Sequence, residues 1–294
     1  MSKKSIFITV ASWEERCWFG FEKLWADVSY DKAIVFYFEE YLYVSKQTIA
    51  NIRSLCQSRQ IECSILPLSF KDSLASWKTV NSILDAEIAE TDSTFIDIST
   101  MPRETIWTIF DNIAERGIQI EYAYHTPKDY APDDWISRDP GKPRIVYGLG
   151  GISRLQMPTR LIIATGYDVD RVKQMIFFFE PEKTILGIQV GDQFGNKLKN
   201  EEKFKDEFKD HCDIEFFNTD AYSIDHGQSE IEKKILENSS NSDIVMSSLG
   251  PKLSAIALFT LHKKYENTSL AYGPSYEYNL KYSSGLLNTI LGKI

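Results

Sequence analysis

The sequence predicts an α/β protein made of two tandem Rossmann-like domains, each a doubly wound parallel sheet, related by a pseudo-twofold duplication. Three observations support this prediction. Short apolar, β-branched runs alternate with longer amphipathic segments, these runs keep the same order in both halves, and a stretch rich in Pro, Gly and Asp separates the halves. Such alternation favours a parallel sheet covered on both faces. The expected boundaries are an N-terminal domain at 1–126, a linker at 127–158 and a C-terminal domain at 159–294.

The elements of the first half follow from apolar runs separated by polar turns. The run that begins at Ser5 is β-branched, and it ends at a polar turn that contains acidic residues and then an arginine. Similar runs predict further strands at 32–38, 62–66, 93–98 and 118–124. Amphipathic spacing predicts helices at 76–89 and 104–116.

The second half repeats this plan. Its first run begins at Arg160 and again ends at a polar turn with an acid and an arginine. Further strands are predicted at 183–190, 213–217, 242–247 and 269–272, and helices at 227–238 and 253–265. Arg16 matches Arg171 at a spacing of 155 residues, and Arg103 matches Lys252 at 149. This small drift indicates a duplication with small changes in loop length.

Composition excludes several classes of protein. The 294 residues are 43% hydrophobic and 26% charged, a balance typical of globular proteins. The net charge of -9 argues against a surface that binds extended duplex nucleic acid. Neither a signal peptide nor an apolar window of about 18 residues is found. We therefore expect a cytoplasmic protein that does not enter a membrane.

Cysteine and histidine spacing predicts neither a metal site nor a disulfide framework. The histidines form no HxxxH or HExxH group, and the cysteines form no CxxC pair. The four cysteines are Cys17, Cys56, Cys63 and Cys212. We expect no bound metal and no cofactor.

Two loops in each half have the composition of a site for an anionic group. They follow the first and fourth predicted strands, at the edge of an open parallel sheet where ligands bind. They combine hydroxyl groups, glycines or free backbone N–H groups, and a cation, which are the groups that phosphates need. The candidate ligand-binding residues are Ser12, Trp13, Arg16, Asp97, Ser99, Thr100 and Arg103 in the first half, and Thr165, Gly166, Arg171, Ser247, Ser248, Gly250 and Lys252 in the second.

Arg103 and Lys252 are the most informative of these residues. Each directly follows a proline and is expected in the first turn of a helix. A cation there opposes the helix macrodipole, at a cost of about 0.3–1 kcal/mol when exposed. Because both halves keep the cation, a role in binding is favoured over a role in stability.

Structural interpretations of the same residues stay open. The hydroxyl residues also suit helix caps, and Asp97 also suits a turn or cap. The arginines that follow the first strands also suit surface ion pairs with the adjacent Glu15 and Asp170. The indoles of Trp18 and Trp25, together with Trp13, have the spacing of one packed helix face.

The segment from Asp97 to Arg103, with the form D-x-[ST]-x-x-x-[RK], resembles the signature of the CRISPR-associated Rossmann-fold (CARF) sensor domains. In the second half Ser248 and Lys252 fit [ST]-x-x-x-[RK], but Met246 replaces the acid. The resemblance covers about 5–123 and 160–272. It implies binding of cyclic oligoadenylates or related nucleotide messengers at a dimer interface. One chain would then supply both protomers, and its halves would form one composite pocket.

Family members usually have an attached effector, and none is evident here. There is no R-x₄₋₆-H ribonuclease pattern, no convincing D…ExK nuclease core and no P-loop. Glu232-Lys-Lys234 reads as solvated charge, and Gly148-Leu-Gly-Gly151 reads as a flexible joint in the linker. We therefore expect a sensor of prokaryotic antiviral defence that binds a small polyanionic nucleotide and acts through a separate effector or defence protein.

Three other functions stay open. The first is metal-independent, ring-nuclease-like cleavage of the ligand by its own 2′-hydroxyl, which needs only alignment and charge stabilisation. Its candidate catalytic residues are Arg103, Lys252, Ser99 and Ser248. The second is a protein-interaction module with a vestigial pocket. The third, weaker one is a sugar- or nucleoside-cleaving enzyme, whose single candidate acid or base is His125.

Overall fold

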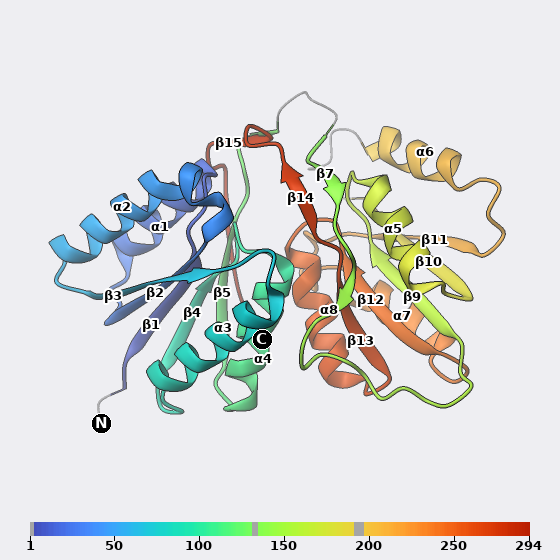
Figure 1. Ribbon diagram of the computed structural model, residues 1–294, viewed down its shortest axis with the longest axis horizontal. Helices are drawn as coiled ribbons and strands as arrows, with labels where there is room; N and C mark the ends of the chain where they lie inside the picture. The colour runs from blue at the N-terminus through green and yellow to red at the C-terminus, as the bar shows by residue number, and fades with distance from the viewer. Residues whose placement is uncertain (1–2, 131–134, 191–196) are drawn as a thin grey trace. The chain divides into compact units, whose positions relative to one another are not determined.

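The computed structural model describes residues 3–130, 135–190 and 197–294, and it confirms an α/β protein with Rossmann-like topology. The chain forms two compact units (Figure 1). The first unit contains Met1–Asp133 and Leu280–Ile294, and the second contains Asp134–Asn279. Within the described residues, none of the helices combines the length and the apolar character that a membrane span requires.

The first unit is a six-stranded sheet in the order β16-β5-β4-β1-β2-β3. Strands β1 to β5 are parallel, and β16 lies antiparallel beside β5. Its elements are β1 Ser5–Val10, α1 Glu15–Asp27, β2 Lys32–Phe38, η1 Glu39–Tyr41, α2 Leu42–Ser58, β3 Glu62–Leu68, α3 Ser73–Glu87, β4 Ser93–Asp97, α4 Arg103–Glu115, β5 Ile120–His125, β6 Asp129–Tyr130, β15 Ser283–Ser284 and β16 Thr289–Lys293.

The second unit is a six-stranded sheet in the order β11-β10-β9-β12-β13-β8. Strands β9 to β13 are parallel, and β8 lies antiparallel beside β13. Its elements are β7 Ser137–Pro140, β8 Arg144–Ile145, β9 Thr159–Ala164, α5 Val169–Phe179, β10 Lys183–Gln189, α6 Lys197–Glu207, β11 Ile214–Thr219, α7 Gln228–Asn238, β12 Asp243–Ser248, α8 Leu253–Lys264, β13 Thr268–Tyr272 and β14 Ser275–Tyr278.

The two sheets have the same strand order when each unit's strands are numbered along the chain, namely 3-2-1-4-5 followed by one antiparallel strand. All ten strands predicted from apolar runs are present, within a few residues of the expected ends. Helices α2 and α6 lie where the sequence analysis assigned no element. The strand order reverses between the first and fourth strands of each unit, so the loops after those two strands lie next to one another at the carboxyl ends of the strands.

The compact units do not follow the expected domain boundaries. Residues 280–294, expected in the C-terminal domain, belong to the first unit, because β16 pairs with the edge strand β5. Most of the expected linker belongs to the second unit, where it forms β7 and β8. An edge strand exposes unpaired backbone N–H and C=O groups, and a short antiparallel strand satisfies them.

The last two strands in each half of the chain pair with strands of the other half. After β5 the chain forms β6 and then continues into β7 and β8, which pair with β14 and β13 of the second unit. After β13 it forms β14 and then continues into β15 and β16, which pair with β6 and β5 of the first unit. We call β7–β8 and β15–β16 the exchanged arms. Each run of eight strands thus contributes its last two strands to the other unit.

The last glycine of the expected joint is packed against β13. A Cβ atom at Gly151 would overlap the carbonyl oxygen of Thr268 at the start of β13. The amide of Gly151 also donates to Ser269 Oγ at 2.9 Å. The segment is therefore fixed against β13, and the interpretation as a flexible joint is wrong.

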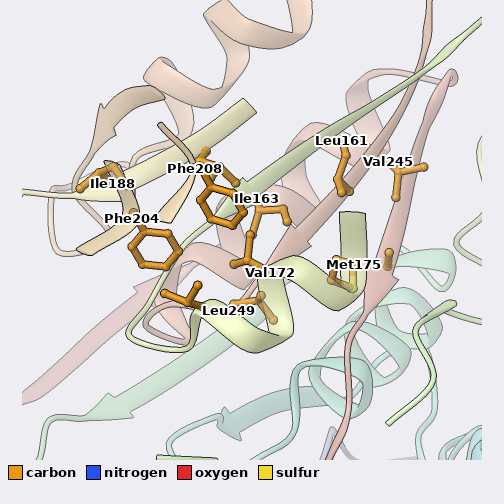
Figure 2. Close-up of a cluster of buried hydrophobic side chains, with 12 residues drawn as sticks. Leu161, Ile163, Val172, Met175, Ile188, Phe204, Phe208, Val245 and Leu249 are labelled. Carbon is orange, nitrogen blue, oxygen red and sulfur yellow. The ribbon is translucent and has the colours of Figure 1, made fainter. Parts of the chain in front are cut away.

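Each unit has its own apolar core. In the first unit α1 packs Phe21 and Trp25 in a stack, with ring centroids 4.7 Å apart, against Phe7 of β1. Trp18 packs on the same cluster, so the helix-face interpretation is confirmed for Trp18 and Trp25. Burying one large aromatic side chain contributes about 4–6 kcal/mol before the entropy cost. Figure 2 shows the core of the second unit, with α5 and α6 side chains packed on β9 and β10.

Candidate functional site

Arg16, at the start of α1, is a buried structural residue rather than an exposed cation. Its side chain is 2% exposed, and its guanidinium makes five polar contacts. Nε and Nη2 bind one carboxylate oxygen of Glu14, and Nη1 donates to the carbonyl oxygen of His125 at 3.1 Å and to the Tyr124 hydroxyl at 3.5 Å. Nη2 also donates to the Tyr282 hydroxyl at 3.3 Å. These contacts use all five N–H groups of an arginine.

Arg171 has the corresponding role in the second unit. It lies in the first turn of α5, is 5% exposed, and donates through Nε to the carbonyl oxygen of Gly273 at 3.0 Å. Gly273 directly follows β13, as His125 ends β5, so each arginine ties the first helix to the end of the fifth strand. Neither arginine forms the surface ion pair considered from the sequence. Arg16 pairs with Glu14, and the structure gives Arg171 no ion pair within the described residues.

The loop after β4 is buried and bound to its neighbours. Asp97 and Ser99 are both 0% exposed. Asp97 Oδ1 accepts hydrogen bonds from the amide of Ser99, at 2.9 Å, and from the Ser99 hydroxyl. The Ser99 hydroxyl in turn accepts from the amide of His125 at 2.7 Å, and Thr100 Oγ1 donates to the carbonyl oxygen of Val10 at 2.9 Å. The loop thus joins the ends of β4, β5 and β1.

A buried carboxylate and imidazole face one another beside this loop. Asp97 Oδ2 and His125 Nε2 are 3.9 Å apart, beyond hydrogen-bond distance, and neither atom has a hydrogen-bond partner within the described residues. His125 Nδ1 lies 3.0 Å from Thr289 Oγ1 of β16. Burial lowers the pKa of His125, although the charge of Asp97 opposes this. His125 is therefore a buried, neutral side chain at neutral pH rather than an exposed acid or base.

In the second unit the two predicted loops touch through their glycines. A Cβ atom at Gly166, after β9, would overlap the carbonyl oxygen of Leu249. A Cβ atom at Gly250, after β12, would overlap the carbonyl oxygen of Thr165. The amide of Gly250 donates to Ala164 at 3.0 Å. The absence of side chains at both glycines is what allows this backbone contact.

The hydroxyl residues of the second unit are also buried. Thr165 Oγ1 donates to the carbonyl oxygen of Gly187 at 2.7 Å, and Ser248 Oγ lies 2.7 Å from Ser254 Oγ of α8. Ser247 is 0% exposed. In the strand register Ser247, rather than Met246, has the position of Asp97, because Asp97 pairs with Thr9 and Ala123 while Ser247 pairs with Ile163 and Ala271. The carboxylate contact to the following hydroxyl therefore has no counterpart at this position.

Arg103 and Lys252 are the two charged candidates that remain partly exposed. Arg103 is the first residue of α4, as predicted, and Pro102 is its cap residue. Lys252 is the cap residue of α8, one position before the helix, and its backbone is already helical at φ -64° and ψ -21°. In the first unit the charge of Arg103 acts on Tyr282, whose pKa is nevertheless raised by burial.

The last two candidates lie in the loop after β1. Ser12 is 6% exposed, and its hydroxyl accepts from the amide of Glu14 at 3.4 Å. Trp13 precedes α1 in the chain, so it is not part of that helix's packed face. Its ring centroid lies 5.2 Å from that of Tyr41.

Sequence reasoning missed the residues that arrive from the end of the chain. Tyr282 contacts Arg16, and the Ser283 hydroxyl donates to Glu14 at 2.8 Å. The amide of Gly285 donates to Glu15 at 2.7 Å. These contacts span more than 260 residues, and no local pattern reveals them.

The charged side chains of Glu232, Lys233 and Lys234 on α7 form ion pairs. Glu232 binds Lys264 and the Tyr265 hydroxyl, and Lys233 and Lys234 pair with neighbouring glutamates at the surface. Across the described parts of the chain, three or more His, Cys, Asp or Glu side chains nowhere gather in a group that could hold a metal ion.

Comparison with known proteins finds likeness only in structure. No family model and no curated protein matches the sequence. A Type III CRISPR defence DNA nuclease activated by cyclic oligoadenylate matches with a TM-score of 0.51 and 7% identity, over 87% of this chain and 63% of that one. Can2 from Sulfobacillus thermosulfidooxidans, solved with cyclic tetra-adenylate, matches with a TM-score of 0.32 and 11% identity, over 40% of this chain and 31% of that one.

A universal stress protein from Archaeoglobus fulgidus DSM 4304 covers 91% of this chain and 95% of its own, with a TM-score of 0.27 and 11% identity. The TM-scores of the universal stress protein and of Can2 are too low to show a common fold. The chain spans less than two thirds of the length of the nuclease and about a third of the length of Can2. The likeness to the CRISPR defence nuclease shows that the two proteins share a fold.

Proposed function

We propose that this chain senses a nucleotide second messenger of the cyclic oligonucleotide type in prokaryotic antiviral defence, and that it acts through a separate effector. One observation supports this most directly. Two units of identical strand order each place a partly exposed cation, Arg103 or Lys252, at the start of the helix that follows the fourth strand. The fold is shared with a nuclease that cyclic oligoadenylate activates, and the motif at Asp97–Arg103 resembles that of CARF sensors.

The chemistry of these positions suits phosphate. The N-terminus of a helix directs its first N–H groups outward, and a cation beside them adds charge-assisted hydrogen bonds to an anionic oxygen. Each cation lies at the carboxyl edge of a parallel sheet, beside the point where the strand order reverses. Each unit thus offers one contact of this kind to a phosphate group.

The contacts of the other candidates divide them into two groups. Arg16, Arg171, Asp97 and Ser99 are buried and bound within their own unit, and we assign them to shaping the loops. We assign direct ligand contacts to Arg103 and Lys252, and we assign Gly166 and Gly250 to the backbone contact that holds the two loops of the second unit together. The remaining candidates, Ser12, Trp13, Thr100, Thr165, Ser247 and Ser248, line or support the same loops in this proposal.

Calorimetric titration of the full chain tests the proposal. Cyclic tri-, tetra- and hexa-adenylate, with linear tetra-adenylate as the comparison, are titrated into wild type, Arg103→Ala and Lys252→Ala. We expect a cyclic ligand to bind and each variant to weaken binding at least tenfold, about 1.4 kcal/mol. Lys233→Ala, a surface lysine paired with Glu230, removes the same charge elsewhere and should bind as wild type. Absence of binding by every nucleotide would contradict the proposal.

The same mixtures separate sensing from cleavage. After prolonged incubation without added metal, chromatography should return the cyclic ligand unchanged if the chain only senses it. A linear product that ends in a 2′,3′-cyclic phosphate would instead assign the ring-nuclease-like reaction. Loss of that product in Arg103→Ala or Lys252→Ala, with binding retained, would identify the cation that stabilises the developing charge.

A further inference from the structure

Two cysteine side chains of the first unit pack in the same apolar cluster. Cys56 lies near the end of α2, and Cys63 is the second residue of β3. A tight turn joins them, in which the amide of Ile61 donates to the carbonyl oxygen of Cys56 at 2.9 Å. Both side chains pack in the apolar cluster around Phe7, and neither forms a disulfide.

The two thiols differ in their access to solvent. Cys56 is 0% exposed, whereas Cys63 is partly exposed. Cys63 also lies on β3, the last strand of its sheet, where one side of the backbone has no neighbouring strand. Cys63 is therefore the member of the pair that a small dissolved oxidant reaches first.

The charge around the pair favours the same order. The neighbouring thiol of Cys56 and the guanidinium of Arg53 lower the pKa of Cys63. The thiol of Cys63 and burial raise the pKa of Cys56. Because the thiolate is the nucleophilic form of cysteine, Cys63 is the more reactive partner.

We propose that Cys56 and Cys63 form an oxidisable dithiol, in which Cys63 reacts with a peroxide and Cys56 then closes a disulfide. The Cys63 thiolate attacks hydrogen peroxide, the O–O bond breaks, an S–O bond forms, and hydroxide leaves. The Cys56 sulfur then attacks the sulfenic acid, an S–S bond forms, and the S–O oxygen leaves as water. In total two thiols lose two electrons and two protons, and one peroxide becomes two water molecules.

The other two cysteines provide internal controls. Cys17 is buried, its thiol lies 3.5 Å from the carbonyl oxygen of Val10, and burial raises its pKa to about 12. It should resist peroxide. Cys212 is an exposed thiol in the second unit, so its oxidation reports simple accessibility.

Peptide mass spectrometry of the folded full chain tests the proposal. The proteins compared are wild type, Cys56→Ser, Cys63→Ser and Cys212→Ser. Each is treated with hydrogen peroxide and dimedone, then denatured in the presence of an alkylating agent that blocks the remaining thiols, and digested. We expect wild type and Cys212→Ser to give a Cys56–Cys63 disulfide that dithiothreitol reverses. Cys56→Ser should stop at a dimedone-labelled Cys63, and Cys63→Ser should leave Cys56 unoxidised.

Two results would overturn the proposal. One is a wild-type protein in which Cys212 is oxidised while Cys56 and Cys63 remain reduced. The other is a dimedone-labelled Cys63 in wild type without any disulfide, because this would show that Cys56 cannot reach it. The wild-type digest alone distinguishes the expected disulfide from both of these results, so the test does not depend on the folding of the serine variants.

Discussion

The guanidinium of Arg16 donates to the backbone carbonyl oxygen of His125 at 3.1 Å and thereby fastens the start of α1 to the end of β5. Arg171 repeats this contact with the carbonyl oxygen of Gly273 at 3.0 Å. The two units therefore share a structural arginine as well as a strand order. The arginine recurs at matching positions and in both units binds the backbone at the end of the fifth strand.

Removal of the Arg16 side chain should destabilise the first unit strongly. Arg16→Met leaves the buried carboxylate of Glu14 without its cation, which typically costs about 3–5 kcal/mol. Urea unfolding measures the change. Lys233→Ala, at the surface, should change stability by less than about 0.5 kcal/mol. A loss of stability smaller than about 1 kcal/mol for Arg16→Met would contradict the buried role.

The chain's last segment should stabilise the first unit through Tyr282. Tyr282→Phe removes only the hydroxyl that accepts from Arg16 at 3.3 Å, so we expect a loss of about 1.5 kcal/mol, typical of a hydrogen bond to a charged group. Thermal unfolding provides the measurement. Tyr43→Phe is the matched control, since Tyr43 is 73% exposed in the same unit. Equal stability of the two variants would argue against this contact.

The contact between the loops of the second unit should not tolerate a side chain. Gly166→Ala places a methyl group against the carbonyl oxygen of Leu249 and should cost about 1–3 kcal/mol. Gly150→Ala is the control, because a Cβ there would meet Ile145 Cγ2 at an ordinary 3.7 Å. Chemical denaturation compares them. An unchanged midpoint for Gly166→Ala would show that the loops separate without cost.

Stability should decline on mild acidification because of His125. Burial lowers its folded-state pKa below the usual 6.5, so the unfolded chain binds the proton more readily. The stabilisation is complete above pH 6.5 and is lost as the pH falls below it. His226, also buried with a lowered pKa, adds to the same decline.

The slope of stability against pH checks this prediction. Between about pH 7.5 and pH 5.5, His125→Gln should lose less stability than wild type loses, whatever its stability at pH 7.5. Lys233→Ala, a substitution at the surface, should follow the wild-type slope. Identical slopes for wild type and His125→Gln would show that His125 does not contribute.

Sequence patterns predicted local structure well because each pattern acts over a few residues. Apolar, β-branched runs located every parallel strand, and the proline before Arg103 marked the start of α4. The positions of Arg16 and Asp97 were also predicted, but their roles were not. Whether such a side chain faces a ligand or is buried depends on residues such as Tyr282 that lie far away in the sequence.

The succession of elements along the chain, the repeated plan and the loops in which polar residues gather could all be predicted from the sequence, since hydrophobic periodicity and turn residues encode these locally. The other features arise only from the tertiary fold. It placed the exchanged arms on the edges of both sheets, buried two arginines and brought Cys56 beside Cys63. The arms pair through backbone groups that every residue possesses, so no side-chain pattern specifies which edge they join.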